Sequence, residues 1–201
     1  MMDFSSTPIV ELAAIVAQHL QQRGVDVVLV GGLAVEIYAE NLYLTKDIDM
    51  VNTNYLKPSQ LHKVMGELGF HKQGRVYAHD TTDITVEFPS GPLAVGRNLI
   101  KNTTLVHVAN GVIPILYAID VVKDRIAAFI HWQDRQSLVQ AMGVMLKHGL
   151  TPEELKVFCV DEGDDSSFNL LSTFYAQSQN LEIEHMAQLE SVLTKVLLNN
   201  I

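Results

Sequence analysis

The 201-residue sequence contains one cysteine, Cys159, and has fewer basic than acidic residues: 14 Lys and Arg against 23 Asp and Glu. A single cysteine excludes an internal disulfide and is typical of a reducing compartment. We expect Cys159 to be a small buried hydrophobic residue. The eight histidines form no His-x-x-x-His spacing and no Cys-x-x-Cys pair is present, so the sequence does not support a zinc site.

Long hydrophobic runs and a signal peptide are also missing. No apolar run approaches the roughly 20 residues needed to cross a bilayer, and no basic region precedes the first apolar residues, as a signal peptide requires. We therefore expect a cytoplasmic protein that does not associate with membranes.

The negative charge is concentrated near the C-terminus. Residues 151–201 contain nine acidic residues and two basic ones, Lys156 and Lys195. A protein that grips nucleic acid non-specifically normally has a basic surface. The composition therefore disfavours a large nucleic acid as ligand.

The hydrophobic pattern divides the chain into a region of strands and helices, residues 1–116, and an all-helical region, residues 117–201. This order predicts an α+β fold. In the first region, Thr7 and Pro8 are expected to open a helix that Gly24 ends, and Asn110-Gly111 is a hairpin signal. The expected strands are 27–30, 47–51, 70–73, 76–78, 84–88, 104–109 and 112–116, and a loop is expected over 41–46.

The stretch from Val27 to Val51 contains two acids on a predicted strand. Side chains alternate along a strand, so Asp47 and Asp49 share one face while Ile48 and Met50 point into the core. Two such acids repel each other unless a cation lies between them. Ligands that are all oxygen suit Mg²⁺ or Mn²⁺, so this pair predicts a site for one of these ions.

Gly31 and Gly32 stand where the strand 27–30 turns directly into a helix. Their backbone N–H groups are unobstructed and lie at the positive end of the helix dipole, which is a favourable place for phosphate. A phosphate site at the end of one strand and a metal site on the next are what nucleotidyl transfer needs.

Gly31-Gly32, a helix and then Asp47-x-Asp49 on a strand resemble the nucleotidyltransferase superfamily. This superfamily includes DNA polymerase beta, aminoglycoside nucleotidyltransferases and the minimal nucleotidyltransferases of toxin–antitoxin pairs, to which the chain is most similar. The resemblance implies a small mixed β-sheet core with flanking helices over residues 1–116. The sequence departs from the family in two places. Many members have arginine where this chain has Tyr43, and the third acid of the site, discussed next, is a glutamate here but more often an aspartate in the family.

A third carboxylate is expected from the strand 84–88, where Asp83, Thr85 and Glu87 share one face. Adjacent strands lie about 4.8 Å apart, so an acid on a neighbouring strand can complete the metal site. We predict Glu87 for this role, with Asp83 as the alternative.

Three further positions have both a functional and a structural explanation. Thr45 can hydrogen-bond its own loop or a phosphate. Lys123 and Asp134 resemble residues that face the active site in toxin-type members, and the resemblance implies that Lys123 neutralises triphosphate charge. The alternative for Lys123 and Asp134 is that they belong to an ordinary charged helix face.

The resemblance implies a Mg²⁺- or Mn²⁺-dependent enzyme that transfers a nucleoside monophosphate from an NTP to a hydroxyl acceptor. The acceptor could be a tRNA, a protein or a small molecule. A non-catalytic nucleotide-sensing or protein-binding module with the same fold is the alternative. The helical C-terminal region is expected to offer a surface for a protein partner or for self-association.

Overall fold

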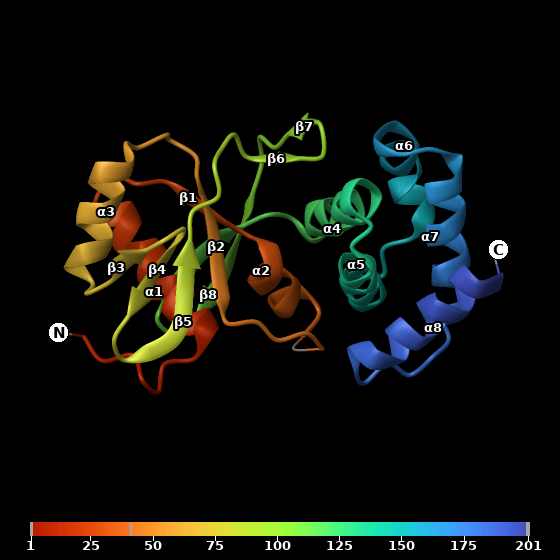
Figure 1. Ribbon diagram of the computed structural model, residues 1–201, viewed down its shortest axis with the longest axis horizontal. Coiled ribbons are helices and arrows are strands. Elements are labelled where there is room, and N and C mark those ends of the chain that lie inside the picture. The colour runs from red at the N-terminus through yellow and green to blue at the C-terminus, as the bar shows by residue number, and fades with distance from the viewer. Residues whose placement is uncertain (1, 41, 200–201) are drawn as a thin grey trace. The chain divides into compact units, whose positions relative to one another are not determined.

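The computed structural model describes residues 2–40 and 42–199, so Asn41, the first residue of the expected loop 41–46, lies outside the described residues. The chain forms two compact units. Of the described residues, the first contains 2–34, 44–94 and 99–117, and the second contains 35–40, 42–43, 95–98 and 118–199. Each unit is described separately below, and Figure 1 gives the labels of their elements.

A seven-stranded mixed sheet forms the centre of the first unit. Its order is β3-β4-β5-β2-β1-β9-β8. Strand β2 runs antiparallel to β1 and parallel to β5, while β1 runs parallel to β9. The predicted α+β fold with a mixed sheet is therefore confirmed. The strands are β1 (Val27–Val30), β2 (Asp47–Asn52), β3 (His71–Gln73), β4 (Val76–His79), β5 (Thr82–Glu87), β8 (Thr104–Val108) and β9 (Gly111–Ile115).

Helices α1 (Ile9–Gln22) and α3 (Pro58–Glu67) lie next to each other in the first unit (Figure 1). Arg23 Nε donates to Glu67 Oε2 at 2.8 Å and links the two helices. Pro8 occupies the N-cap position of α1, and no side chain caps this end. The expected Thr7 cap is therefore wrong by one position.

Helix α2 (Gly31–Tyr38) begins directly at Gly31, where the glycine pair predicts that the strand turns into a helix. Two local details of the first part of the chain differ from the sequence prediction. In the β8–β9 hairpin Val108 pairs with Gly111, so Ala109 and Asn110 form the turn, not Asn110 and Gly111. Two short strands, β6 (Ala94–Val95) and β7 (Asn98–Leu99), pair with each other and were not predicted.

The described part of the second unit is helical after residue 117, as predicted. Its helices are amphipathic, and several have side-chain caps. Asp134 and Asp164 cap the starts of α5 and α7, and Thr151 forms a capping box with Glu154. The helices are α4 (Ala118–Trp132), α5 (Arg135–His148), α6 (Pro152–Glu162), α7 (Asp165–Ser178) and α8 (Met186–Asn199).

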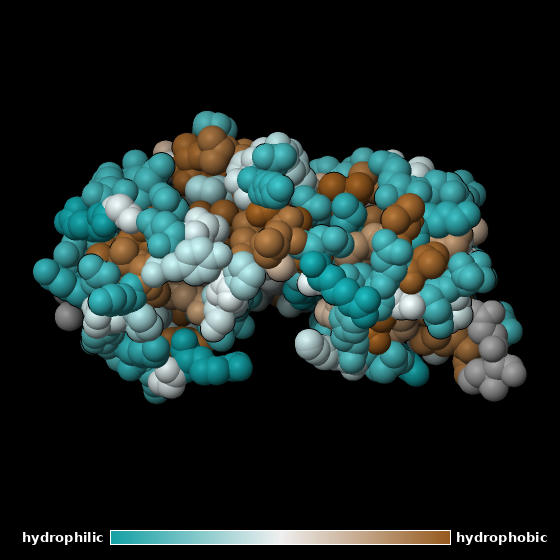
Figure 2. Space-filling model, turned by 90° about the horizontal axis from the view of Figure 1, so that it is seen from above, coloured by the Kyte–Doolittle hydropathy of each residue, from teal (hydrophilic) through white to brown (hydrophobic). Residues whose placement is uncertain are grey.

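Hydrophobic residues reach the surface in several small groups on the face drawn in Figure 2. Large exposed apolar side chains include Tyr55 and Leu99 in the first unit and Trp132 and Val157 in the second. Within the described residues, no helix combines the length and the hydrophobicity that a membrane span requires.

Candidate functional site

Strand β2 presents its two aspartates on the face opposite its core residues. Ile48 and Met50 are fully buried, whereas Asp47 is exposed and Asp49 is half-buried. The alternation therefore separates the acids from the apolar core, as the strand period predicts. Both carboxylates are on a central strand of the sheet.

Gly31 lies against the carboxylate of Asp49. The residue before it, Val30, pairs with Asp49 across β1 and β2. Gly31 has a φ of +66°, and a β-carbon at this position would lie 2.2 Å from Asp49 Oδ2. Glycine is therefore required twice, once for the left-handed backbone and once for the close approach. The fold places the start of α2 directly beside one of the predicted metal ligands.

The parallel pairing of β2 with β5 brings Glu87 beside Asp49. In this register Asp49 is the partner of Glu87, and Asp47 is the partner of Thr85. The Thr85 hydroxyl donates a 2.6 Å hydrogen bond to Asp47 Oδ1. Thr85 is a positioning residue that the sequence argument placed on this face without giving it a role.

Asp83, the alternative third carboxylate, lies farther along β5. It precedes the partner of Asp47 by two residues, and its side chain is highly exposed. Lys46 Nζ lies 3.4 Å from Asp83 Oδ2. The register therefore places Glu87, not Asp83, next to Asp49.

Glu87 is also engaged by a cation that the sequence argument missed. Arg75 Nε lies 3.7 Å from Glu87 Oε1. Arg75 precedes Val76, which pairs with Glu87 across β4 and β5. No local motif marks Arg75, because its position depends on how β3, β4 and β5 pair.

The three predicted carboxylates are neighbours on two strands, but their side chains are not preorganised as a metal site. Among residues 2–40 and 42–199, no group of three His, Cys, Asp or Glu side chains is arranged to hold a metal ion. The ion pair of Glu87 with Arg75 gives one reason, because it directs this carboxylate toward the guanidinium.

Thr45 and Gly32 lie at the edges of this site. The backbone N–H of Asp47 donates to Thr45 Oγ1 at 3.2 Å, so Thr45 orders the chain just before β2. This is the structural role expected for Thr45, and a phosphate contact stays a prediction. Gly32 is the second residue of α2, where backbone N–H groups lack partners within the helix.

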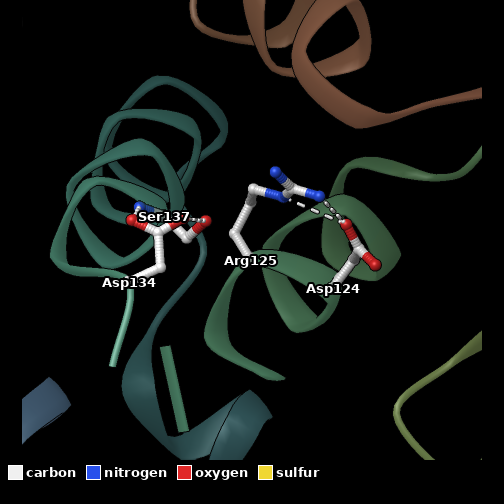
Figure 3. Close-up of polar contacts among 4 residues, drawn as sticks. All are labelled: Asp124, Arg125, Asp134 and Ser137. Carbon is white, nitrogen blue, oxygen red and sulfur yellow. Dashed lines mark hydrogen bonds and ion pairs between the residues drawn. The ribbon is translucent and has the colours of Figure 1, made fainter. Parts of the chain in front are cut away.

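Lys123 belongs to the second unit, where it is part of the charged face of α4. Its Nζ lies 3.5 Å from Asp120 Oδ1 one turn earlier. In the next two positions Arg125 Nε donates to Asp124 Oδ2 at 3.0 Å, a pair drawn in Figure 3. The contact of Lys123 with a triphosphate stays a prediction.

Asp134 has a clear structural role at the start of α5. Its Oδ1 accepts the backbone N–H groups of Gln136 and Ser137 at 3.0 and 3.3 Å. The Ser137 hydroxyl donates to Asp134 Oδ2 at 2.7 Å (Figure 3). These bonds satisfy backbone donors that the first turn of a helix leaves free.

The N-terminal part of the chain matches a described protein family. Residues 10–88 match a family described as a nucleotidyl transferase of unknown function. The matched segment includes Gly31, Gly32, Asp47, Asp49 and Glu87. No curated protein matches the sequence.

Several solved structures are similar to this chain. An antigenic nucleotidyltransferase-like protein from Paracoccidioides brasiliensis has a TM-score of 0.57 at 13% identity, covering 91% of this chain and 90% of its own. A structure of ANT(2″)-Ia in complex with adenylyl-2″-tobramycin has a TM-score of 0.48 at 12% identity, covering 77% and 92%. A solution structure of the antibiotic-resistance factor ANT(2″)-Ia has a TM-score of 0.42 at 15% identity, covering 88% and 94%.

The similarity to the first of these structures establishes the fold. The family match shows, in addition, that the sequence of the N-terminal part is similar to nucleotidyl transferases. The resemblance to the nucleotidyltransferase superfamily is thereby confirmed. Residues 10–88 are similar to this nucleotidyl transferase family, and the chain as a whole has the fold of the nucleotidyltransferase-like protein.

Proposed function

We propose that this chain is a metal-dependent nucleotidyltransferase that moves a nucleoside monophosphate from an NTP to a hydroxyl acceptor. The observation that carries the proposal is the shared register of β1, β2 and β5. It brings the backbone of Gly31, the carboxylate of Asp49 and the carboxylate of Glu87 to neighbouring positions. The family match supports nucleotidyl transfer in general, while the metal and the acceptor are part of the proposal.

The donor set suits a hard divalent cation. Asp47, Asp49 and Glu87 offer only oxygen ligands on adjacent strands, and Asp47 is already held in place by Thr85. Asp47 and Asp49 would hold Mg²⁺ or Mn²⁺, with Glu87 as the third ligand. Such ions, when bound, neutralise triphosphate charge and lower the pKa of the acceptor hydroxyl.

The residues of the chain have distinct roles in this proposal. The N–H groups of Gly31 and Gly32 bind phosphate oxygens at the start of α2. The acceptor oxygen attacks the α-phosphorus and pyrophosphate leaves, while Glu87 accepts the proton of the acceptor hydroxyl. Arg75 must release Glu87 for this role, and an exposed ion pair contributes only about 0–1 kcal/mol, so its release costs little.

Isothermal titration of ATP, CTP, GTP and UTP, with and without Mg²⁺, tests the proposal. We expect metal-dependent binding of at least one nucleotide. The double variant Asp47→Asn/Asp49→Asn should not bind, because it keeps the shape of both side chains but removes their charge. Thermal unfolding of this variant should be unchanged to within a few degrees, which separates loss of the site from loss of the fold.

Absence of binding to the wild-type chain at millimolar nucleotide would overturn the proposal and favour the non-catalytic module. If binding is present, labelled NTP offered with tRNA, with protein or with a small hydroxyl compound would identify the acceptor class. A toxin–antitoxin context, a cytoplasmic location and a partner surface on the helical region remain predictions.

A further inference from the structure

A pocket of about 430 Å³ lies in the first unit, apart from the three carboxylates. Its lining residues come from the ends of β2 and β5, the connection from β2 to α3, and the residues on either side of the turn between β3 and β4. This volume is typical of sites for small organic ligands. The residues of its wall that matter below are Asn52, Tyr55, Lys72, Arg75, Tyr77 and Phe88.

Aromatic rings form one side of this pocket. Tyr77 and Phe88 contact each other edge to face, with ring centroids 5.5 Å apart and an angle of 85° between the rings. Tyr77 is buried, which fixes this pair against the sheet. Such rings offer a rigid surface on which a flat ligand can stack.

Tyr55 adds a third ring, and its backbone is unusual. Its φ is +55°, a conformation that residues other than glycine rarely adopt. Its side chain is 68% exposed, so burial does not explain this conformation. The ring lies over Gly91, where a β-carbon would be 3.1 Å from Tyr55 Cε1. Residues with a strained backbone cluster at active sites and ligand-binding sites.

Several polar groups of the pocket are hydrogen-bond donors. Lys72 Nζ lies 5.8 Å from the centroid of the Tyr77 ring. The side chain of Arg75 is 88% exposed, and its ion pair with Glu87 at 3.7 Å is of the weak surface kind that an anionic ligand can replace. Asn52 Oδ1 accepts the backbone N–H of Leu56, but Asn52 Nδ2 is buried and has no hydrogen-bond partner among the described residues.

Acidic side chains are absent from the described residues that line the pocket. This contrasts with the chain as a whole, whose formal net charge is −9. Cationic and donor groups in an otherwise acidic protein select for a ligand that supplies negative charge and acceptor atoms.

We propose that this pocket binds a small planar aromatic anion. The ring of the ligand stacks against Tyr55 and Phe88, and its carboxylate, sulfonate or phosphate pairs with Lys72 and Arg75. The proposal does not depend on nucleotidyl transfer, because none of the proposed catalytic residues lines the pocket.

Fluorescence titration with 1-anilinonaphthalene-8-sulfonate tests this site in the native full chain without metal or nucleotide. We expect saturable binding with a stoichiometry of one. The variant Lys72→Ala/Arg75→Ala should weaken binding by about tenfold or more, since charge-assisted contacts are the strong ones. N-phenyl-1-naphthylamine, which has the same rings without the sulfonate, should bind the wild type and this variant alike.

A matched control removes two exposed lysines elsewhere. Lys63→Ala/Lys195→Ala changes the net charge by the same amount and should leave the affinity for the sulfonate unchanged. Tyr55→Ala should weaken binding of both probes, because both use the ring.

Three results would overturn the proposal. One is absence of saturable binding, the second is equal affinity of the wild type and the Lys72→Ala/Arg75→Ala variant, and the third is an equal loss in the control variant. Because the assay contains no nucleotide, a failure here leaves the nucleotide titration of the proposed function unaffected, and the reverse also holds.

Discussion

The backbone of Gly31 lies directly against the side chain of Asp49. A methyl group there would meet Asp49 and would also force an L-residue into a left-handed conformation. The conformation alone costs about 1–2 kcal/mol. Displacement of the Asp49 side chain adds to this cost.

We therefore expect Gly31→Ala to lower the free energy of unfolding by more than Gly24→Ala does. Gly24 has a similar φ of +73°, but a β-carbon at this position would meet nothing within 4 Å. Denaturant unfolding of both variants measures the difference. Equal losses would show that Asp49 moves aside without cost.

Thr85 determines how Asp47 is held. Thr85→Val keeps the shape of the side chain but removes the hydroxyl that donates to Asp47 Oδ1. We expect Mn²⁺ affinity to fall by about 10-fold or more, as is usual when a partner of a metal ligand is removed. Thr82→Val on the same strand is the control, because its hydroxyl bonds to the backbone of Ile84. Unchanged affinity in Thr85→Val would contradict a positioning role.

At the scale of the element, secondary structure was best predicted where the hydrophobic pattern repeats several times along a helix or strand. The first helix, the helix after Gly31 and Gly32, the all-helical character after residue 117, the strand 27–30 and the strand around Asp47 were all predicted. The strands β6 and β7 were missed because two residues contain no period to recognise. The hairpin turn at Ala109 and Asn110 was shifted by one residue, because the pairing of Val108 with Gly111 is a property of two strands together.

The start of α5 provides a test of what Asp134 does. Asp134→Ala removes an N-cap and should lower the free energy of unfolding by about 0.5–2 kcal/mol. Asp134→Asn keeps a good capping residue and should cost much less. If nucleotide binding survives in Asp134→Asn, the residue acts as a cap; its loss there with stability intact would show that the charge itself is used.

Glu162, at the end of α6, holds the β6–β7 turn. Its side chain is 1% exposed, its Oε1 accepts the backbone N–H of Arg97 at 2.6 Å, and Oε2 lies 2.9 Å from His131 Nε2. Burial opposes ionisation of Glu162, but the hydrogen bonds from Arg97 and His131 and their charges outweigh it. The pKa of Glu162 is therefore lower than its usual value.

A lowered pKa makes stability dependent on acid. The unfolded carboxyl binds protons more readily, so the contribution of Glu162 is present above its usual pKa of 4.5 and is lost as the pH falls through the lower folded value. Glu162→Gln should cost about 1–3 kcal/mol near neutral pH and reduce the acid-dependent loss below pH 4.5. Unfolding curves from pH 7 to 3 measure both. If Glu162→Gln loses stability with falling pH as much as the wild type does, Glu162 is not the source of this loss.

At the scale of the whole molecule, Cys159 is a built-in reporter of unfolding. It is fully buried in α6, as predicted, and burial raises the pKa of its thiol to about 11. We expect the native chain to resist iodoacetamide at pH 8, because the thiolate is the reactive species. Labelling should increase along the same denaturant curve as the loss of helical circular dichroism, with Cys159→Ala as the blank. Rapid labelling without denaturant would show that α6 opens locally.

The parts of the site that sequence reasoning predicted are contiguous or nearly so. Gly31, Asp47 and Asp49 fall within one strand–helix–strand segment, where alternation and helix geometry are sufficient. The pairing of Glu87 with Asp49 required the order of the strands, and Arg75 and the pocket beside Tyr55 required the complete sheet. Contacts of this kind depend on tertiary register, which no local pattern contains.

The contact between Gly31 and Asp49 also bears on how this protein can change over evolution. The two positions share one small volume, so substitutions there are not independent. Among related sequences, a side chain at position 31 should be accompanied by a residue smaller than aspartate at position 49, and such lineages should have lost the carboxylate along with the glycine. Covariation of these two positions would therefore mark which relatives have given up the site while keeping the fold.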